Sequence, residues 1–406
     1  MRVHVPIPAV LDEPSFRLFW LGTVLSNVGT RATVAANLWQ VLLLTNSTAE
    51  VGLVGLSEAV ALLVLAPLGG AVADRFDRRI LLQITQSTSL VASLSLTILT
   101  FSGQIQPWNI YVAVIAVSAA QTFEGPARLA LLPALVSRDR VVDAFALTNP
   151  TRELAILLGP PLAGILIAVA GNAGYVYAFD AATYALLVVL LAFIKIAPVS
   201  ATTRRESVWA SILQGFSYVK ERRLIWQLMS LDFSATFFGA YRVLLPTLAR
   251  DILKVGPTGY GILAAAPAAG AILGSAVVFR MRAFEHKGWL ILAATAGYAL
   301  GCIALAQSVA FGTALVAAGW IGVCDATAST LRQVLVQVET PDTLRGRVSS
   351  AYQMVSRGGP SLGSAEMGAF AGALGAPLAL TLGASVTLAY TALLAIRGRT
   401  IRQYKG

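Results

Sequence analysis

Charged side chains are scarce in this sequence. Of its 406 residues, only 12% are Asp, Glu, Lys or Arg, whereas 56% are hydrophobic and the mean hydropathy is +0.72. An average soluble domain carries about 25% charged residues. The composition therefore excludes an ordinary soluble protein and indicates a chain whose backbone satisfies its hydrogen bonds inside lipid.

Histidine and cysteine are also rare, with two of each. His4 and His286 lie outside the apolar runs, whereas Cys302 and Cys324 lie inside them, and no set of these residues has the spacing of metal ligands. The P-loop motif for ATP is absent as well. We expect no metal, no cofactor and no enzymatic activity, so any transport would draw on an ion gradient or on the gradient of the substrate.

Long runs without a charged residue predict helices rather than barrel strands. A helix crosses the bilayer with about 20 apolar residues, whereas a barrel strand alternates polar and apolar residues over about ten positions. We expect an all-α integral membrane protein with twelve transmembrane helices. The predicted spans cover residues 16–44, 49–73, 80–102, 108–133, 144–170, 174–195, 224–248, 257–279, 288–306, 309–337, 347–372 and 376–396.

Lys and Arg residues gather in every second loop, and among the alternate loops only the one with Arg250 and Lys254 is basic. This asymmetry is the positive-inside pattern. It predicts a multi-pass protein of the cytoplasmic (inner) membrane with both termini in the cytoplasm. The net charge of +10 is then explained by topology, and we expect no nucleic-acid partner.

The two halves of the chain resemble each other. Arg128 and its successors resemble the segment at Arg332, an offset of 204, and Arg140 and its successors resemble the segment at Arg347, an offset of 207. A repeat near this period is typical of two-bundle transporters. The predicted domains are an N-terminal six-helix bundle (1–195), a cytoplasmic linker with an amphipathic helix (196–223) and a pseudo-symmetric C-terminal six-helix bundle (224–406).

The first basic loop reads Gly70-Ala-Val-Ala-Asp74-Arg75-Phe76-Asp77-Arg78-Arg79. It resembles the signature G-x-x-x-D-[RK]-x-G-[RK]-[RK] of the major facilitator superfamily, with Asp77 in place of the second Gly, as in the drug- and siderophore-exporter branch. The resemblance implies a major facilitator fold and a gating role for Gly70, Asp74, Arg75, Asp77, Arg78 and Arg79. Asp74 would pair with Arg of the facing half and hold the inner side shut. A loop that only sets topology is the alternative.

The fifth predicted span contains Gly159-Pro160-Pro161-Leu162-Ala163-Gly164. It resembles the antiporter motif G-P-x-x-G-G of the same superfamily, with Ala163 replacing one Gly. Small residues allow close helix contact, and Pro bends the helix. We expect Gly159, Pro160 and Gly164 to form a tight contact between the halves, with an ordinary membrane-helix kink as the alternative.

Charged residues inside the spans indicate where the substrate passes. Each costs about 2.5–3.5 kcal/mol on insertion scales, so each needs a partner or a wet cavity. In major facilitator folds the first, fourth, seventh and tenth spans line that cavity. The predicted cavity residues are Asn27, Arg31, Asn37, Glu124, Asp232, Phe233, Phe237, Tyr241 and Asp325.

A partly desolvated carboxylate can carry a proton, and we expect Glu58, Asp325 or Glu124 to couple transport to protons. Glu124 could instead form an intrahelical pair with Arg128, four residues away. Asp180 lies near the outer end of its span and is interpreted as a capping or packing residue.

The family resemblance implies a secondary active transporter. We expect a monomeric, proton-coupled antiporter in the lipid bilayer that exports a small amphipathic molecule, such as a drug or siderophore, by alternating access. Three alternatives stay open: a proton symporter or facilitator that imports a metabolite, a lipid or lysolipid translocator, and a receptor or scaffold that transports nothing.

Overall fold

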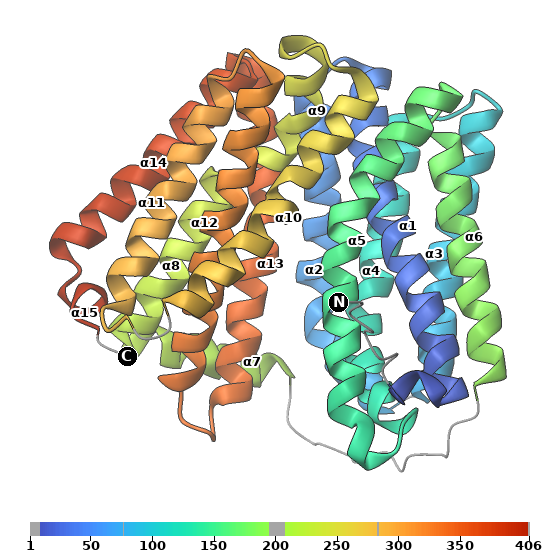
Figure 1. Cartoon of the computed structure of the whole chain (residues 1–406), viewed down its shortest axis with the longest axis horizontal. Coiled ribbons are helices and arrows are strands. Elements are labelled where there is room, and N and C mark those ends of the chain that lie inside the picture. The colour runs from blue at the N-terminus through green and yellow to red at the C-terminus, as the bar shows by residue number, and fades with distance from the viewer. Residues whose placement is uncertain (1–8, 76, 195–207, 282–283, 405–406) are drawn as a thin grey trace, which may run out of the picture.

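The computed structural model describes residues 9–75, 77–194, 208–281 and 284–404, with the backbone alone described at 9, 66–75 and 208–212. The predicted all-α membrane fold is confirmed (Figure 1). The long helices are α1 (Pro14–Thr45), α2 (Thr48–Arg75), α3 (Arg78–Phe101), α4 (Pro107–Leu131), α5 (Val141–Ala170), α6 (Gly174–Phe193), α7 (Val208–Glu221), α8 (Arg223–Phe238), α10 (Gly256–Arg280), α11 (Lys287–Ala306), α12 (Phe311–Val338), α13 (Arg345–Leu374) and α14 (Ala376–Arg397). Short helical segments are η1 (Ala9–Asp12), η2 (Leu132–Ala134), η3 (Arg138–Arg140), η4 (Tyr241–Leu244), α9 (Leu245–Thr247), η5 (Leu248–Ile252) and α15 (Arg399–Arg402).

Nine of the described helical segments are long and apolar enough to cross a bilayer. The chain is thus a multi-pass membrane protein. The helices α1 and α13 span 32 and 30 residues but are less apolar than those nine, and α8 has only 16 residues. The count of twelve spans therefore stays a prediction.

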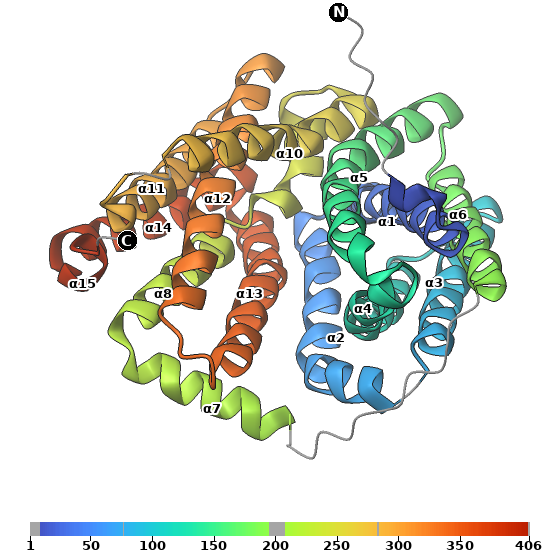
Figure 2. The same ribbon diagram turned by 60° about the horizontal axis from the view of Figure 1, so that its bottom comes forward.

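The described helices form two groups, α1–α6 on one side and α8–α14 on the other (Figures 1 and 2). The pairs α2/α13 and α5/α10 make the main contacts between the groups. One hydrophobic cluster joins both groups near the end of α1, with members such as Trp39 and Tyr260. Two other clusters, around Leu82 and around Leu228, each stay within one group. The groups are therefore packed together at one end and have separate cores at the other.

Contacts between residues 35–48 and residues 247–260 define what we call the closed end. The Trp39 and Tyr260 rings stack with centroids 5.3 Å apart, and the Tyr260 hydroxyl donates to the Ala35 carbonyl at 3.1 Å. The Thr48 and Thr247 hydroxyls lie 2.9 Å apart. Aromatic stacking and hydrogen bonds thus close this end without a buried ion pair between the groups among the residues described here.

Arg250 was the exception in the loop charge pattern, and its contacts give a reason for it. Its guanidinium donates to the Leu42 carbonyl at 3.2 Å and to the Asn46 side-chain oxygen at 3.0 Å, across the closed end. Asn46 is the residue in left-handed conformation that ends α1. A cation at the carbonyl end of a helix is favoured by the helix dipole. The charge at this position therefore fastens one group to the other.

Glycine allows backbone to touch backbone at two places in the interface. A Cβ added at Gly164 in α5 would lie 2.4 Å from the Pro257 carbonyl oxygen, and one added at Gly261 in α10 would lie 2.4 Å from the Pro160 oxygen. On the other side, a Cβ at Gly52 in α2 would lie 2.9 Å from the Gly368 Cα in α13. Such close approach is typical of small residues at membrane helix interfaces.

The predicted seventh span, 224–248, is wrong as one continuous helix. The helix α8 ends at Phe238, and the chain continues through η4, α9 and the π-helical segment η5. Gly239 has low helix propensity, and its carbonyl accepts a hydrogen bond from the Tyr298 hydroxyl at 2.7 Å. Pro246 then lacks the N–H that a continuous helix needs. This break places Arg242 where it can point between the groups.

The predicted amphipathic linker helix is present as α7, while Ser207, its expected N-cap, lies outside the described residues. A Cβ added at Gly215 would lie 2.4 Å from the Arg347 carbonyl oxygen, and the Arg347 guanidinium hydrogen-bonds the Gln214 side chain. The helix therefore packs against the start of α13, at the end opposite the closed end (Figure 2).

We expect Gly164→Ala to weaken the packing of α5 against α10. The added methyl group cannot be accommodated without a backbone shift, and overpacking of this kind costs about 1–3 kcal/mol. The thermal unfolding midpoint of the purified protein should fall. Gly312→Ala, where a Cβ meets nothing within 4 Å, is the matched control, and equal losses in both variants would contradict the prediction.

Candidate functional site

Several charged side chains are exposed although they lie near the middle of membrane-length helices. The exposed ones are Glu58 of α2, Arg152 and Glu153 of α5 and Arg357 of α13. Arg242 of η4, in the break that follows α8, is exposed as well. Charges at this depth require water or a partner. Because α2, α5 and α13 form the interface between the groups, we interpret these residues as the lining of a water-accessible cavity between them.

The electrostatic contacts show that these charges face one another across the interface. Arg31 of α1 interacts with Arg152, Arg242, Glu58 and Glu153. Arg357 interacts with Arg152, and Arg242 with Asp325 of α12. Within the described part of the chain, none of the four arginines has a carboxylate at ion-pair distance. The interface therefore brings together guanidinium groups from both groups of helices, and none of these is paired with a carboxylate among the described residues.

Glu58 of α2 interacts with charges from both groups of helices. Arg31 of the first group and Arg242 of the second act on its carboxylate, and Ser361 of α13 is beside it. It is exposed, so protons can reach it through water. Of the three predicted coupling residues, it is the one that touches elements of both groups.

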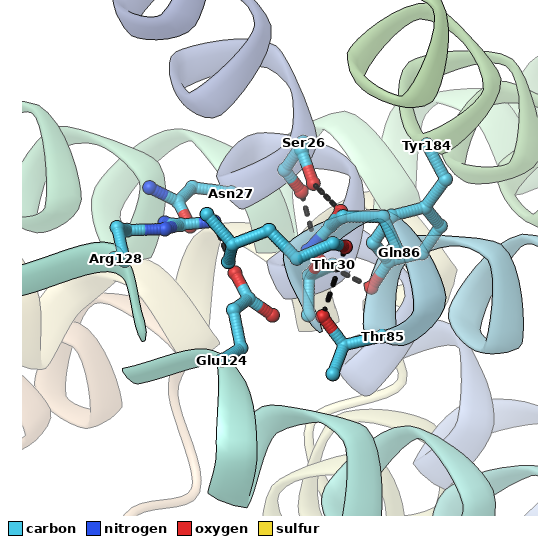
Figure 3. Close-up of polar contacts among 9 residues, drawn as sticks. Ser26, Asn27, Thr30, Thr85, Gln86, Glu124, Arg128 and Tyr184 are labelled. Atoms are coloured by element: carbon cyan, nitrogen blue, oxygen red, sulfur yellow. Dashed lines mark hydrogen bonds and ion pairs between the residues drawn. The ribbon is translucent and has the colours of Figure 1, made fainter. Parts of the chain in front are cut away.

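Arg128 contacts both Asn27 and Glu124 in the first group of helices (Figure 3). Arg128 forms an ion pair with Glu124, four residues earlier on α4, and donates to the Asn27 side-chain oxygen at 3.3 Å. The intrahelical pair that the spacing allowed is thus present. The Arg128 and Glu124 side chains are 18% and 13% exposed, so this polar site is partly open.

The second group has a related site that is sealed. Arg332 of α12 pairs with Asp232 of α8 at 2.6 Å, and their side chains are 1% and 4% exposed. Ser356 donates to Asp232, and Arg332 donates to the Thr295 hydroxyl at 3.4 Å. The site therefore fixes α8, α11, α12 and α13 together, and Asp232 does not line an open cavity in this conformation.

The two sites occupy equivalent positions in the repeat. Asn27 and Asp232 are 205 residues apart, and Arg128 and Arg332 are 204 apart. In each group an Arg of the fourth helix reaches a polar side chain of the first helix. The N-terminal site differs because its acid stands on the same helix as its Arg.

The other predicted cavity residues divide by exposure. Phe233 and Phe237 stack at 5.0 Å, and Phe233 is 37% exposed. Asp325 is partly buried. Tyr241 and Asn37 are buried, Tyr241 against Tyr298 with ring centroids 6.3 Å apart.

The gating loop is described in part. Only the backbone is described at Gly70, Asp74 and Arg75. The Asp74 latch therefore stays a prediction. Asp77 caps α3 by accepting from the Arg79 and Ile80 amides. Arg78 donates to the Ala130 carbonyl at 3.0 Å and Arg79 to the Ala192 carbonyl at 2.6 Å. Both arginines thus bind helices of their own group.

The antiporter-like motif contacts two neighbours. A Cβ at Gly159 would lie 2.5 Å from the Arg31 Cβ, so this position sets how closely α5 approaches the arginine of the cavity. Pro160 and Gly164 contact α10 as described above. The motif therefore joins the cavity wall to the interface between the groups.

The sequence reasoning missed a polar stripe within the first group, between α1, α3 and α6. It contains Thr23, Ser26, Thr30 and Thr33 on α1, Gln86, Ser89 and Ser93 on α3, and Asp180 and Tyr184 on α6. Polar residues three or four positions apart share one helix face. That spacing was visible in the sequence and would have shown that Asp180 has polar neighbours.

Comparison with known proteins gives consistent results. A family model for transmembrane secretion effectors matches residues 8–404. The enterobactin exporters of Shigella boydii serotype 18 and Escherichia coli are each 28% identical over 370 residues, covering 90% of this chain and 87% of theirs.

Solved structures of transporters share the fold. A peptide transporter POT has a TM-score of 0.76 at 12% identity, covering 96% of this chain and 95% of its own. The nucleoside transporter NupG has a TM-score of 0.72 at 16% identity, covering 94% and 98%. The proteins in these comparisons are transporters rather than enzymes.

We expect Asp232→Asn to destabilise the protein strongly, because it leaves Arg332 charged and buried without a counter-ion. Breaking a buried pair in this way costs about 3–5 kcal/mol. The thermal unfolding midpoint should fall far more than in Asp342→Asn, which removes the exposed partner of Arg345, a pair worth about 0–1 kcal/mol. The double variant Asp232→Asn/Arg332→Gln should recover part of the loss, and no recovery would argue against charge as the cause.

Proposed function

This chain belongs to the transmembrane secretion effector family and has the major facilitator fold, and from that premise we propose that it exports a small amphipathic molecule by alternating access in exchange for protons. The observation that carries the proposal is the set of exposed charged side chains on α2, α5 and α13, the helices through which the two groups face each other. The interface of two related halves is the usual place of the substrate site in secondary transporters.

Alternating access needs an interface that can close at either end. The closed end uses aromatic stacking and hydrogen bonds, which can separate without breaking a buried ion pair among the described residues. The loop charges support placing both termini in the cytoplasm, as in an inner-membrane protein. The closed end then faces outward, and the cavity receives its cargo from the cytoplasm.

Proton coupling is supported by the position of Glu58. When ionised, it neutralises part of the field of Arg31 and Arg242, which belong to different groups. A proton removes that charge and changes the attraction across the cavity, so protonation and the orientation of the groups are linked. Glu124 is already paired with Arg128, and Asp325 lies near Arg332 as well as Arg242. We therefore favour Glu58 of the three candidates.

The cargo class is proposed from two observations. The relatives named above are enterobactin exporters, and the stacked Phe233–Phe237 pair, with Phe233 partly exposed, offers an aromatic surface near charged groups. Aromatic walls with a few polar groups suit amphipathic molecules. A siderophore or a drug of similar character fits this combination.

We expect Glu58→Gln to abolish the effect of a pH gradient on transport. In proteoliposomes, enterobactin movement by the unmodified protein should rise when protons can flow in the opposite direction, because Glu58 must load and release a proton in each cycle. The variant should move substrate at the rate measured without a gradient while keeping substrate exchange. Glu339→Gln, outside the membrane spans, is the control.

Other results would replace the proposal. Flux that is unchanged when the gradient is collapsed would remove proton coupling. Movement of substrate together with protons would indicate a symporter, and scrambling of labelled lipid without movement of enterobactin would indicate a lipid translocator.

We expect a disulfide between Thr48→Cys and Thr247→Cys to stop transport. The two hydroxyls are 2.9 Å apart across the closed end, so the thiols should oxidise readily and prevent this end from opening. The native Cys302 and Cys324 are buried and should not interfere. Transport should return on reduction, whereas each single variant should be unaffected by oxidant. Full activity of the cross-linked protein would contradict alternating access through this end.

A further inference from the structure

Asp180 is a buried carboxylate inside the first group of helices, away from the cavity. It lies on α6 and is 1% exposed. The Ser93 hydroxyl of α3 donates to its Oδ2 at 2.8 Å. Its Oδ1 is buried without a hydrogen-bond partner among the described residues, and the Thr33 side chain of α1 is near the carboxyl group. It is thus held between three helices.

Among the described side chains, no basic group forms an ion pair with this carboxylate. The charged residues of α3 are confined to its first two positions, and Asp180 is the only charge on α6. On α1, Arg31 interacts with the cavity residues instead. Tyr184 is the titratable group that faces Asp180. An ionised carboxylate buried in this way would cost several kcal/mol.

The surroundings of Oδ1 do not suit a metal ion. A Cβ added at Gly29 of α1 would lie 2.7 Å from Oδ1 and 2.7 Å from the Thr183 hydroxyl, so α1 occupies the adjacent space. The Thr183 hydroxyl is already used, because it donates to the Asp180 carbonyl oxygen at 2.7 Å. Hard cations take about six oxygen ligands, whereas the hydroxyls of Ser93 and Thr183 beside this carboxyl group already donate their hydrogen bonds.

We propose that Asp180 is a proton-binding site, protonated in this conformation, that exchanges its proton with the cavity along the polar stripe of α1, α3 and α6. The helix α1 packs close to Oδ1 at Gly29, and among the residues that the structure describes no basic side chain forms an ion pair with this carboxylate.

The polar stripe extends from Asp180 toward Glu124 and Arg128. The Tyr184 hydroxyl lies 2.7 Å from the Thr30 hydroxyl, and the Ser89 side chain is near it. Tyr184 also interacts with the charges of both Asp180 and Glu124. It therefore links the surroundings of Asp180 to the polar site of Asn27, Glu124 and Arg128. Further along, Ser26 donates to Gln86 at 3.4 Å. Figure 3 shows Ser26, Thr30, Gln86 and Tyr184 beside Asn27, Glu124 and Arg128.

The position of Gly29 links this proton to substrate binding, a step that rests on the proposed function. The helix α1 presents Gly29 to Asp180. The same helix carries Asn27, which contacts Arg128, and Arg31, which interacts with the charges between the groups. Loss of the proton places a charge against α1, which must shift or admit water to solvate it. The side chains of Asn27 and Arg31 then shift with the helix.

Infrared spectroscopy tests the protonation directly. The purified full chain, in a detergent without ester groups, should show the C=O stretch of a buried carboxylic acid at neutral pH, with the downshift in D₂O that an exchangeable acid gives. The band should be absent in Asp180→Asn and present in Glu58→Gln. Ser93→Ala, which removes one hydrogen bond, should move the band to higher frequency without removing it.

Each outcome decides the proposal. A neutral-pH spectrum without the band would overturn the proposal, and so would a band that Asp180→Asn leaves unchanged. A band that disappears when NaCl replaces KCl would overturn it as well, because that result would indicate a sodium site. Because the infrared measurement needs no transport, it can test the protonation of Asp180 even if the export assay fails. In that assay, Asp180→Asn should lose the response to the pH gradient and keep substrate exchange. A normal response would remove Asp180 from coupling.

Discussion

A charge inside a bilayer needs either water or a partner, and this constraint orders the whole structure. Where the partner is a side chain, as in Asp232–Arg332, the site is sealed and four helices are fixed together. Where the described residues offer no carboxylate at ion-pair distance, as for Arg31 and Arg152, the charge depends on water between the groups. Charged residues thus have two roles in this chain. A buried ion pair holds helices of the second group together, whereas the charges between the groups attract water.

Much of the fold follows from the sequence, because uncharged runs of membrane length leave few alternatives to a helix. The loop charges and the offset near 205 residues then indicate orientation and repetition. The break after Phe238 was not predictable in this way, since Gly and Pro are tolerated in many membrane helices. In this structure the break at Gly239 is stabilised by the Tyr298 hydroxyl, which donates a hydrogen bond to the Gly239 carbonyl.

The candidate site was predictable by residue type but not by pairing. Charges in the spans pointed to Glu58, Glu124 and Asp325, yet whether Asp232 faces water or Arg332 depends on how helices far apart in sequence pack. Asp180 shows the limit most clearly. Its place near one end of a span suggested a cap, whereas its surroundings are set by Ser93 and Thr33 on two other helices. A side chain's solvation depends on its neighbours in space, which depth along one helix does not reveal.

The glycine contacts have a mechanical consequence. Gly52 against Gly368 and Gly164 against Gly261 are two places where the groups touch through backbone. Once the contacts of the closed end separate, two rigid bodies still held at these two places keep one free rotation, about the line through them. Arg345 lies 23 residues before Gly368 on α13, about 35 Å along the helix, so a turn of about ten degrees moves that end by about 6 Å. The line between the glycine pairs therefore acts as a hinge, and the helix beyond it as a lever.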